Sequence, residues 1–130
     1  MTFLDSSAII DYLRDVDHVV EYLDGREPFF TSTICVYEVI DGRLGSGETD
    51  VTGLREDFGG VQALDLSENI ALEALRIQDE LMNDGHRLTT PDALIAATAR
   101  STGDELVVAD ADFETDHLTG LLDVTNLRDR

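Results

Sequence analysis

Four carboxylates in this sequence lie in apolar surroundings. Asp5 follows the apolar residues of TFL, Glu38 interrupts the run ICVYEVI, Asp92 precedes the run ALIAATA, and Asp110 follows LVVA. If these side chains meet, their charges need compensation, because two unit charges about 4 Å apart repel by about 4 kcal/mol at an effective dielectric constant of roughly 20. Oxygen ligands suit hard cations such as Mg²⁺ or Mn²⁺, which orient a phosphodiester and activate a water. The four acids therefore predict metal-assisted hydrolysis of nucleic acid.

Each acid also has a simpler structural explanation. Asp5 can cap the helix that follows it, and Glu38 can lie at the edge of an apolar stripe and reach water. Asp92 is expected in a first helical turn, where the helix dipole stabilises a carboxylate by about 0.3–1 kcal/mol. Asp110 can be a turn residue, and Asp112, two residues further on, can substitute for it in a site. Each acid alone is weak support, and only the combination favours a common site.

The predicted secondary structure explains how the acids can meet. Strands alternate with helices, which favours an α/β fold with a parallel sheet flanked by helices on both faces. Asp5 and Asp110 then follow strands and lie at the carboxyl edge of the sheet, where ligands bind in open α/β folds. The predicted strands cover 2–4, 27–31, 61–64, 106–109 and 122–125, and the predicted helices cover 6–14, 18–23, 33–44, 51–58, 68–83 and 91–100.

Capping residues predict where several of these helices begin, because a side-chain oxygen there can accept a free backbone N–H. The expected caps are Ser6 or Ser7 for the first helix, Ser32 or Thr33 for the helix of Glu38, Ser67 for the helix over 68–83, and Thr90 for the helix of Asp92. Pro91 then occupies the favoured first helical position.

Length and composition indicate one domain over residues 1–130. No run of about 18 apolar residues is present, and the N-terminus lacks the pattern of a secretion signal, so we expect no contact with a membrane. The single Cys35 stands in an apolar run and cannot form an internal disulfide. We interpret it as a core thiol, which favours a reducing, cytoplasmic location.

The charge is strongly negative. The formal net charge is −19, and all nine basic residues are Arg. Such a chain repels itself at low salt, whereas at about 1 M salt the Debye length falls to roughly 3 Å and screens most of the repulsion. We therefore expect a halophilic, haloarchaeal cytoplasm, in which many of these acids belong to a salt-adapted surface. Acidity alone then does not exclude a nucleic-acid substrate.

Other residue types offer little chemistry. His18, His86 and His117 stand among polar neighbours without a metal-ligand spacing, and the Gly-rich stretch 45–47 lacks the Lys of a phosphate loop. Arg43 follows the helix of Glu38, and Arg87 precedes the helix of Asp92. Either arginine can contact substrate phosphates or simply face solvent.

The segments TFLDSSAIIDYL, TSTICVYEVIDGRL, TTPDALIAATA and LVVADADF together resemble the motifs of the PIN-domain family, and within it the VapC-type toxins of toxin–antitoxin pairs. The resemblance implies a parallel sheet between helices and an endoribonuclease that depends on Mg²⁺ or Mn²⁺. It also implies a homodimer, an RNA substrate and a VapB-like antitoxin that covers the site.

The same resemblance implies the roles of individual residues. The catalytic acids would be Asp5, Glu38, Asp92 and Asp110, of which all but Glu38 would bind the metal. Val108 and Ala109 stand where many relatives carry Thr or Asn before the last acid, so Asp112 stays an alternative to Asp110. Ser6 matches the small hydroxyl residue that usually follows the first acid and would support the site.

Other functions remain as alternatives. A phosphoacceptor receiver domain would need a late Lys, and a haloacid-dehalogenase phosphatase would need paired aspartates on the first strand; the chain has neither. A PIN-domain nuclease of RNA processing or decay, and a catalytically silent PIN interaction module, are the remaining alternatives. Calorimetry with Mn²⁺ separates the silent module from both nucleases.

Overall fold

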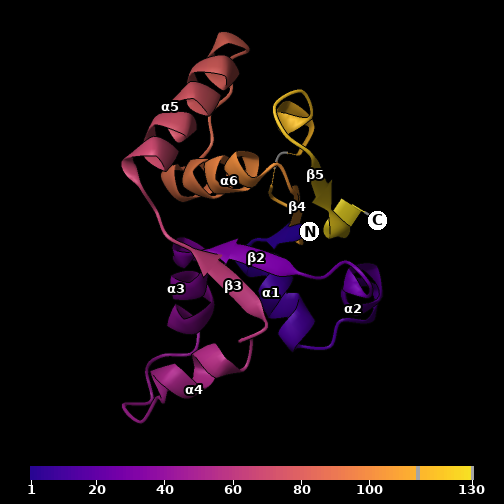
Figure 1. Cartoon of the computed structure of the whole chain (residues 1–130), viewed down its shortest axis with the longest axis vertical. Coiled ribbons are helices and arrows are strands. Elements are labelled where there is room, and N and C mark those ends of the chain that lie inside the picture. The colour runs from indigo at the N-terminus through magenta and orange to yellow at the C-terminus, as the bar shows by residue number, and fades with distance from the viewer. Residues whose placement is uncertain (114, 130) are drawn as a thin grey trace.

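The computed structural model describes residues 1–113 and 115–129. A five-stranded sheet with the order β3-β2-β1-β4-β5 runs through the molecule, and all four strand pairs are parallel (Figure 1). The strands are β1 (Thr2–Leu4), β2 (Phe29–Ser32), β3 (Val61–Leu64), β4 (Glu105–Val108) and β5 (Val124–Asn126). The helices are α1 (Ser6–Leu13), α2 (Asp17–Leu23), α3 (Thr33–Asp41), α4 (Val51–Glu56), α5 (Glu68–Asn83) and α6 (Thr90–Thr102), with the 3₁₀ turns η1 (Thr115–Leu118) and η2 (Leu127–Asp129).

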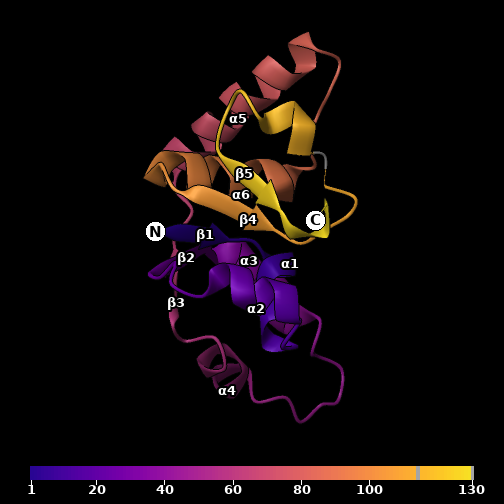
Figure 2. The same cartoon turned by 90° about the vertical axis from the view of Figure 1, so that its right-hand side faces the viewer.

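Helices cover both faces of the sheet, as predicted. α5 and α6 lie on one face, and α1 to α4 lie on the other (Figure 2). Successive strand residues alternate between the two cores: Phe3 packs with α5 and α6, whereas Leu4 packs with α1, α2 and α3. The predicted α/β fold with a helix-flanked parallel sheet is therefore confirmed.

The apolar helices form the core that holds the central strands. α6 buries Ala93 and the stretch from Ile95 to Ala99, as its composition predicts. α5 presents Ile70, Ala74 and Ile77 on its inward face, one turn apart as an amphipathic helix requires. Among the described residues, no helix has the length and apolar character needed to cross a membrane.

The strand register brings the ends of β1 and β4 together. Phe3 pairs with Leu106, and Leu4 pairs with Val107. The backbone N–H of Asp5 donates to the carbonyl of Val107 at 3.1 Å. The residues that follow both strands therefore lie at the same edge of the sheet, next to the start of α1.

Two predicted helix caps are wrong. Asp5, and not Ser6 or Ser7, caps α1, because its carboxylate already stands at the strand end and accepts the N–H of Ala8 at 2.9 Å. Thr89, and not Thr90, caps α6, since its hydroxyl reaches the N–H of Asp92 at 3.3 Å. The expected caps Ser32 and Ser67 are confirmed.

Several boundaries also differ from the predictions by two or three residues, among them those of α3 and the last strand. α3 ends at Asp41 with Gly42 as its C-cap, and not near Leu44, because the exposed residues after Gly42 have no core to pack against. The last strand begins at Val124, and not at residue 122, since pairing of Val124 with Leu106 fixes the register. Leu122 packs against the core instead of joining the strand.

Candidate active site

Asp5 is the most buried of the four acids. It follows β1 and caps α1, and it is only 8% exposed. Its Oδ1 atom accepts hydrogen bonds from the Ser7 hydroxyl at 2.7 Å and from the Ala8 N–H at 2.9 Å. Burial raises the pKa of Asp5 from 3.8 to about 7, with smaller upward contributions from Asp92 and Asp110 and a partial reduction by the two hydrogen bonds. The fold therefore holds a carboxylate whose charge is poorly compensated.

Glu38 projects from α3 toward the start of α1. The Ser6 hydroxyl donates to Oε1 of Glu38 at 3.2 Å. Burial raises the pKa of Glu38, the bond from Ser6 lowers it, and the charge of Asp92 raises it again. The half-buried Glu38 is thus held by Ser6, the serine next to Asp5.

Asp92 lies in the first turn of α6, as the sequence predicts. Burial raises its pKa, a hydrogen bond with Thr89 lowers it, and the charge of Asp110 raises it. The favourable helix dipole at this position explains part of its placement. The effects of Asp92 on the pKa values of Asp5 and Glu38 show that it lies within electrostatic range of both.

Asp110 follows β4 on an exposed turn. Its Oδ1 accepts the N–H of Asp112 at 2.9 Å, and its carbonyl accepts the N–H of Phe113 at 3.1 Å and the side-chain amide of Asn126 at 2.8 Å. The charge of Asp110 raises the pKa of both Asp5 and Asp92. The choice between Asp110 and Asp112 as the fourth acid stays a prediction.

Asp5 and Asp110 lie at the same edge of the sheet, because they follow the paired strands β1 and β4. The charge of Asp92 raises the pKa values of Asp5 and Glu38, and the charge of Asp110 raises the pKa of Asp92. None of the ion pairs seen between described residues involves any of the four. Their negative charge is therefore compensated mainly by hydroxyl and N–H groups, which do not neutralise it.

The chemistry of this donor set fits a hard divalent cation, because all the donors are carboxylate oxygens. The positions of these side chains fit a metal ion less well than their chemistry does. Within the described ranges, no group of three or more His, Cys, Asp or Glu side chains is arranged closely enough to hold a metal ion. Binding of a metal would therefore require the carboxylates to approach one another.

The two candidate phosphate ligands lie away from the acids. Arg87 is exposed, and its guanidinium contacts the Met82 sulfur at 3.3 Å. Arg43 is exposed after α3 and lines a groove between α1 and α3 together with Arg14. The structure brings neither Arg43 nor Arg87 into contact with the four acids.

Three residues of the site were not predicted from the sequence. Ser7 bonds both to Asp5 and to the N–H of Ala109 at 2.9 Å, Thr89 caps α6, and Asn126 contacts the Asp110 turn. The pair of serines after Asp5 was a usable signal for Ser7. No sequence signal pointed to Asn126, because only strand pairing brings it near Asp110.

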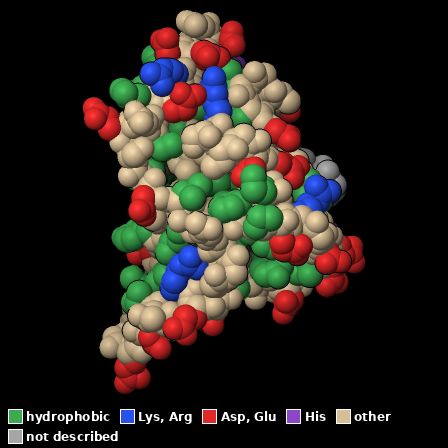
Figure 3. Space-filling view, in the orientation of Figure 1, with side chains coloured by type: hydrophobic (Ala, Val, Ile, Leu, Met, Phe, Trp, Pro, Cys, Tyr) green, Lys and Arg blue, Asp and Glu red, His purple; other side chains and the backbone are tan. Residues whose placement is uncertain are grey.

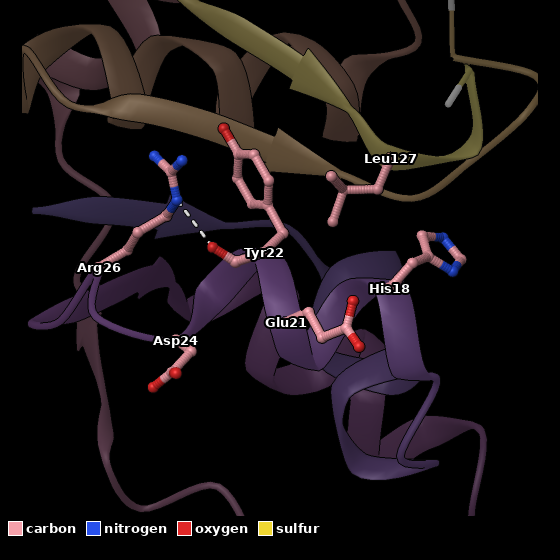
Figure 4. A pocket seen from close by; sticks show the side chains of 6 residues that line it. All are labelled: His18, Glu21, Tyr22, Asp24, Arg26 and Leu127. Carbon is pink, nitrogen blue, oxygen red and sulfur yellow. Dashed lines mark hydrogen bonds between the residues drawn. The ribbon is translucent and has the colours of Figure 1, made fainter.

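A histidine pair and a surface hollow are formed by residues other than the four acids. The His86 and His117 rings stack with centroids 3.4 Å apart, which their sequence positions did not suggest. A separate hollow of about 530 Å³ is lined by His18, Glu21, Tyr22, Asp24, Arg26 and Leu127 (Figure 4). There Arg26 stacks on the Tyr22 ring and donates to the Tyr22 carbonyl at 2.7 Å. None of the four acids is among the residues that line this hollow.

Comparison with known proteins matches residues 2–115 to the PIN domain. Among solved structures, the fold is similar to a DNA-bound VapBC from Salmonella typhimurium, with 22% identity, a TM-score of 0.79 and 96% of each chain covered. It is similar to FitAcB from Neisseria gonorrhoeae, with 24% identity, a TM-score of 0.76 and 97% of each chain covered. It is also similar to VapBC-5 of Mycobacterium tuberculosis, with 27% identity, a TM-score of 0.68, and 96% of this chain and 95% of that chain covered.

No curated protein matches the sequence. The predicted resemblance to PIN domains, and to VapC-type toxins among them, is confirmed by these structures, whereas a haloarchaeal source stays a prediction. The matched segment contains all four acids together with β1 to β4 and the six helices. On this match, the chain belongs to the PIN-domain family.

Proposed function

We propose that this protein is a VapC-type toxin, a nuclease that hydrolyses RNA phosphodiester bonds with the help of Mg²⁺ or Mn²⁺. The observation that carries the proposal is the buried carboxylate of Asp5, whose pKa is raised to about 7 beside Asp92 and Asp110. A carboxylate in this environment gains from a cation. Membership of the PIN family and structural similarity to VapBC complexes support the same activity.

Each residue has a distinct role in this proposal. Asp5, Asp92 and Asp110 would hold the metal, which when bound supplies a Lewis acid for the phosphate and lowers the pKa of a water. Glu38 would complete the site or orient the attacking water by accepting its proton, and Ser6 holds Glu38 in place through the bond at 3.2 Å. Ser7 and the Ala8 N–H stabilise ionised Asp5, the form that binds a cation.

The proposed partner is a VapB-like antitoxin. Several solved structures with this fold are toxin–antitoxin complexes. This chain offers a groove of about 120 Å³ between α1 and α3, lined by Ile10, Leu13, Arg14, Val39, Gly42 and Arg43. The groove combines apolar side chains with two arginines of an otherwise acidic protein. It suits a peptide that presents apolar and acidic side chains, and such a peptide would lie beside the helices that carry Asp5 and Glu38.

We also propose a homodimer. Leu72, Leu75 and Met82 are large apolar side chains that α5 leaves exposed, and Leu66 is exposed just before the helix. An exposed apolar stripe of this kind is typical of a protein interface, and a symmetric dimer would bury it against its own copy. The free, buried Cys35 agrees with a reducing cytoplasm.

The test is cleavage of total RNA in high KCl by the wild-type protein, by Asp92→Asn and by the control Glu80→Gln, an exposed position on α5 outside the proposed dimer stripe. We expect cleavage that requires Mn²⁺, stops with EDTA, is lost in Asp92→Asn and persists in Glu80→Gln. Asp92→Asn should fold, because Thr89 caps α6 through the backbone N–H of residue 92. A folded wild-type protein that neither cleaves RNA nor binds Mn²⁺ would instead identify a silent interaction module.

A further inference from the structure

Asn126 ends β5 and is almost fully buried, at 5% exposure. Its side-chain amide donates to the carbonyl of Asp110 at 2.8 Å and reaches the carbonyl of Phe113 at 3.5 Å. Its Oδ1 atom accepts the N–H of Arg128 at 3.0 Å, which fixes the orientation of the amide. One buried side chain therefore contacts both ends of the turn from Asp110 to Phe113.

The position of the Asp110 carboxylate depends on this turn. Asp110 itself is exposed, and the hydrogen bond that its carboxylate accepts comes from Asp112, within the same turn. The backbone groups on either side of the Asp110 side chain make the contacts with the rest of the fold. The Ser7 hydroxyl accepts the N–H of Ala109 at 2.9 Å, and Asn126 holds the carbonyl of Asp110.

We propose that Asn126 is a positioning residue for the metal site, which it serves by holding the Asp110 carbonyl and hence the carboxylate within reach of Asp5 and Asp92. This inference rests on the proposed function. The segment matched to the PIN family ends at residue 115, so Asn126 lies in a C-terminal strand beyond that match. The last strand of this chain therefore contributes to the geometry of a site whose acids all come from the matched segment.

The expected effect follows from the behaviour of groups that orient metal ligands without touching the metal. Their loss weakens metal affinity or activity by about 10- to 100-fold. Asn126→Ala removes both hydrogen bonds to the turn, and Asn126→Leu does so while keeping a buried side chain of similar size. We expect either variant to raise the Kd for Mn²⁺ by at least about tenfold.

The matched control is Thr125→Val on the same strand. Thr125 donates to Glu105 at 2.6 Å and makes no hydrogen bond to the Asp110 turn, so its loss weakens β5 without releasing that turn. Mn²⁺ titration calorimetry in high KCl, alongside urea unfolding, should show weaker binding for Asn126→Ala or Asn126→Leu and unchanged binding for Thr125→Val. Amide hydrogen exchange of the metal-free Asn126 variants should show lost protection at Phe113, whose N–H donates to the Asp110 carbonyl. Thr125→Val should keep this protection.

Two results would overturn the inference while leaving the proposed function intact: wild-type Mn²⁺ affinity in folded Asn126→Leu, or an equal loss of affinity in Thr125→Val. Equal losses would mean that Asn126 acts only through the stability of β5. A folded wild-type protein that binds no Mn²⁺ would overturn the proposed function itself, and the inference with it.

Discussion

Replacing Asp5 by Asn separates the charge of this residue from its structural role. The amide oxygen of Asn can still accept the N–H of Ala8 and the hydroxyl of Ser7, so the cap of α1 should survive. What disappears is the buried negative charge. We therefore expect Asp5→Asn to stabilise the metal-free protein at neutral and alkaline pH while it abolishes cleavage.

The sign and size follow from the pKa. In the folded protein the pKa of Asp5 is about 7, above the unfolded value of 3.8, because burial penalises its ionised form. Between these pH values the folded state binds more protons than the unfolded state, so the contribution of Asp5 to stability is lost as the pH rises. At about 1.4 kcal/mol for each pH unit, the interval from 3.8 to about 7 corresponds to about 4 kcal/mol. The variant should gain this free energy of unfolding relative to the wild type.

Urea unfolding in high KCl with EDTA, from about pH 5 to about pH 9, measures the difference between the two proteins. The advantage of Asp5→Asn should grow as the pH rises toward 7 and level off near pH 8. Mn²⁺ at about 100 times its Kd should then stabilise the wild type by about 2.7 kcal/mol and leave the variant unchanged. The exposed control Glu80→Gln keeps Asp5 and should match the wild type in both measurements. A difference independent of pH would refute the assignment of Asp5 as a buried, poorly compensated carboxylate.

Three further predictions concern the site, the surface and the assembly. Asp110→Asn should lower RNA cleavage by more than about 100-fold and Asp112→Asn by less than about threefold, and the reverse order would exchange their roles. Carboxylates dominate the charged surface in Figure 3, so cleavage and the free energy of unfolding should both rise between low salt and about 2 M KCl; full activity of folded protein at low salt would contradict this. Leu75→Asp should convert a dimer to a monomer in analytical ultracentrifugation, and a monomeric wild type would exclude the proposed dimer.

The sequence predicts much of the fold because its signals are local. Apolar segments of strand length alternate with amphipathic helices, and glycines mark the breaks between them, so the element order could be predicted closely. The helix cap and the strand boundary that were predicted wrongly depend on which of several neighbouring residues the fold places best. Asp5 rather than Ser6 caps α1 because the strand end places its carboxylate over the free N–H groups. Val124 rather than Leu122 begins the last strand because pairing with β4 fixes the register.

By itself the sequence determined the chemical character of the site. Acids that follow apolar strands or begin apolar helices of a parallel α/β fold are expected near one sheet edge, which predicts Asp5, Asp92 and Asp110 as neighbours. Glu38 is predicted from its place within an apolar helix. Only the tertiary structure decided how these side chains are held. Ser7 reaches Ala109 across 102 positions and Asn126 reaches Asp110 across 16, and burial sets the pKa of Asp5. These contacts arise from strand pairing between distant segments, whose register no local pattern of residues specifies.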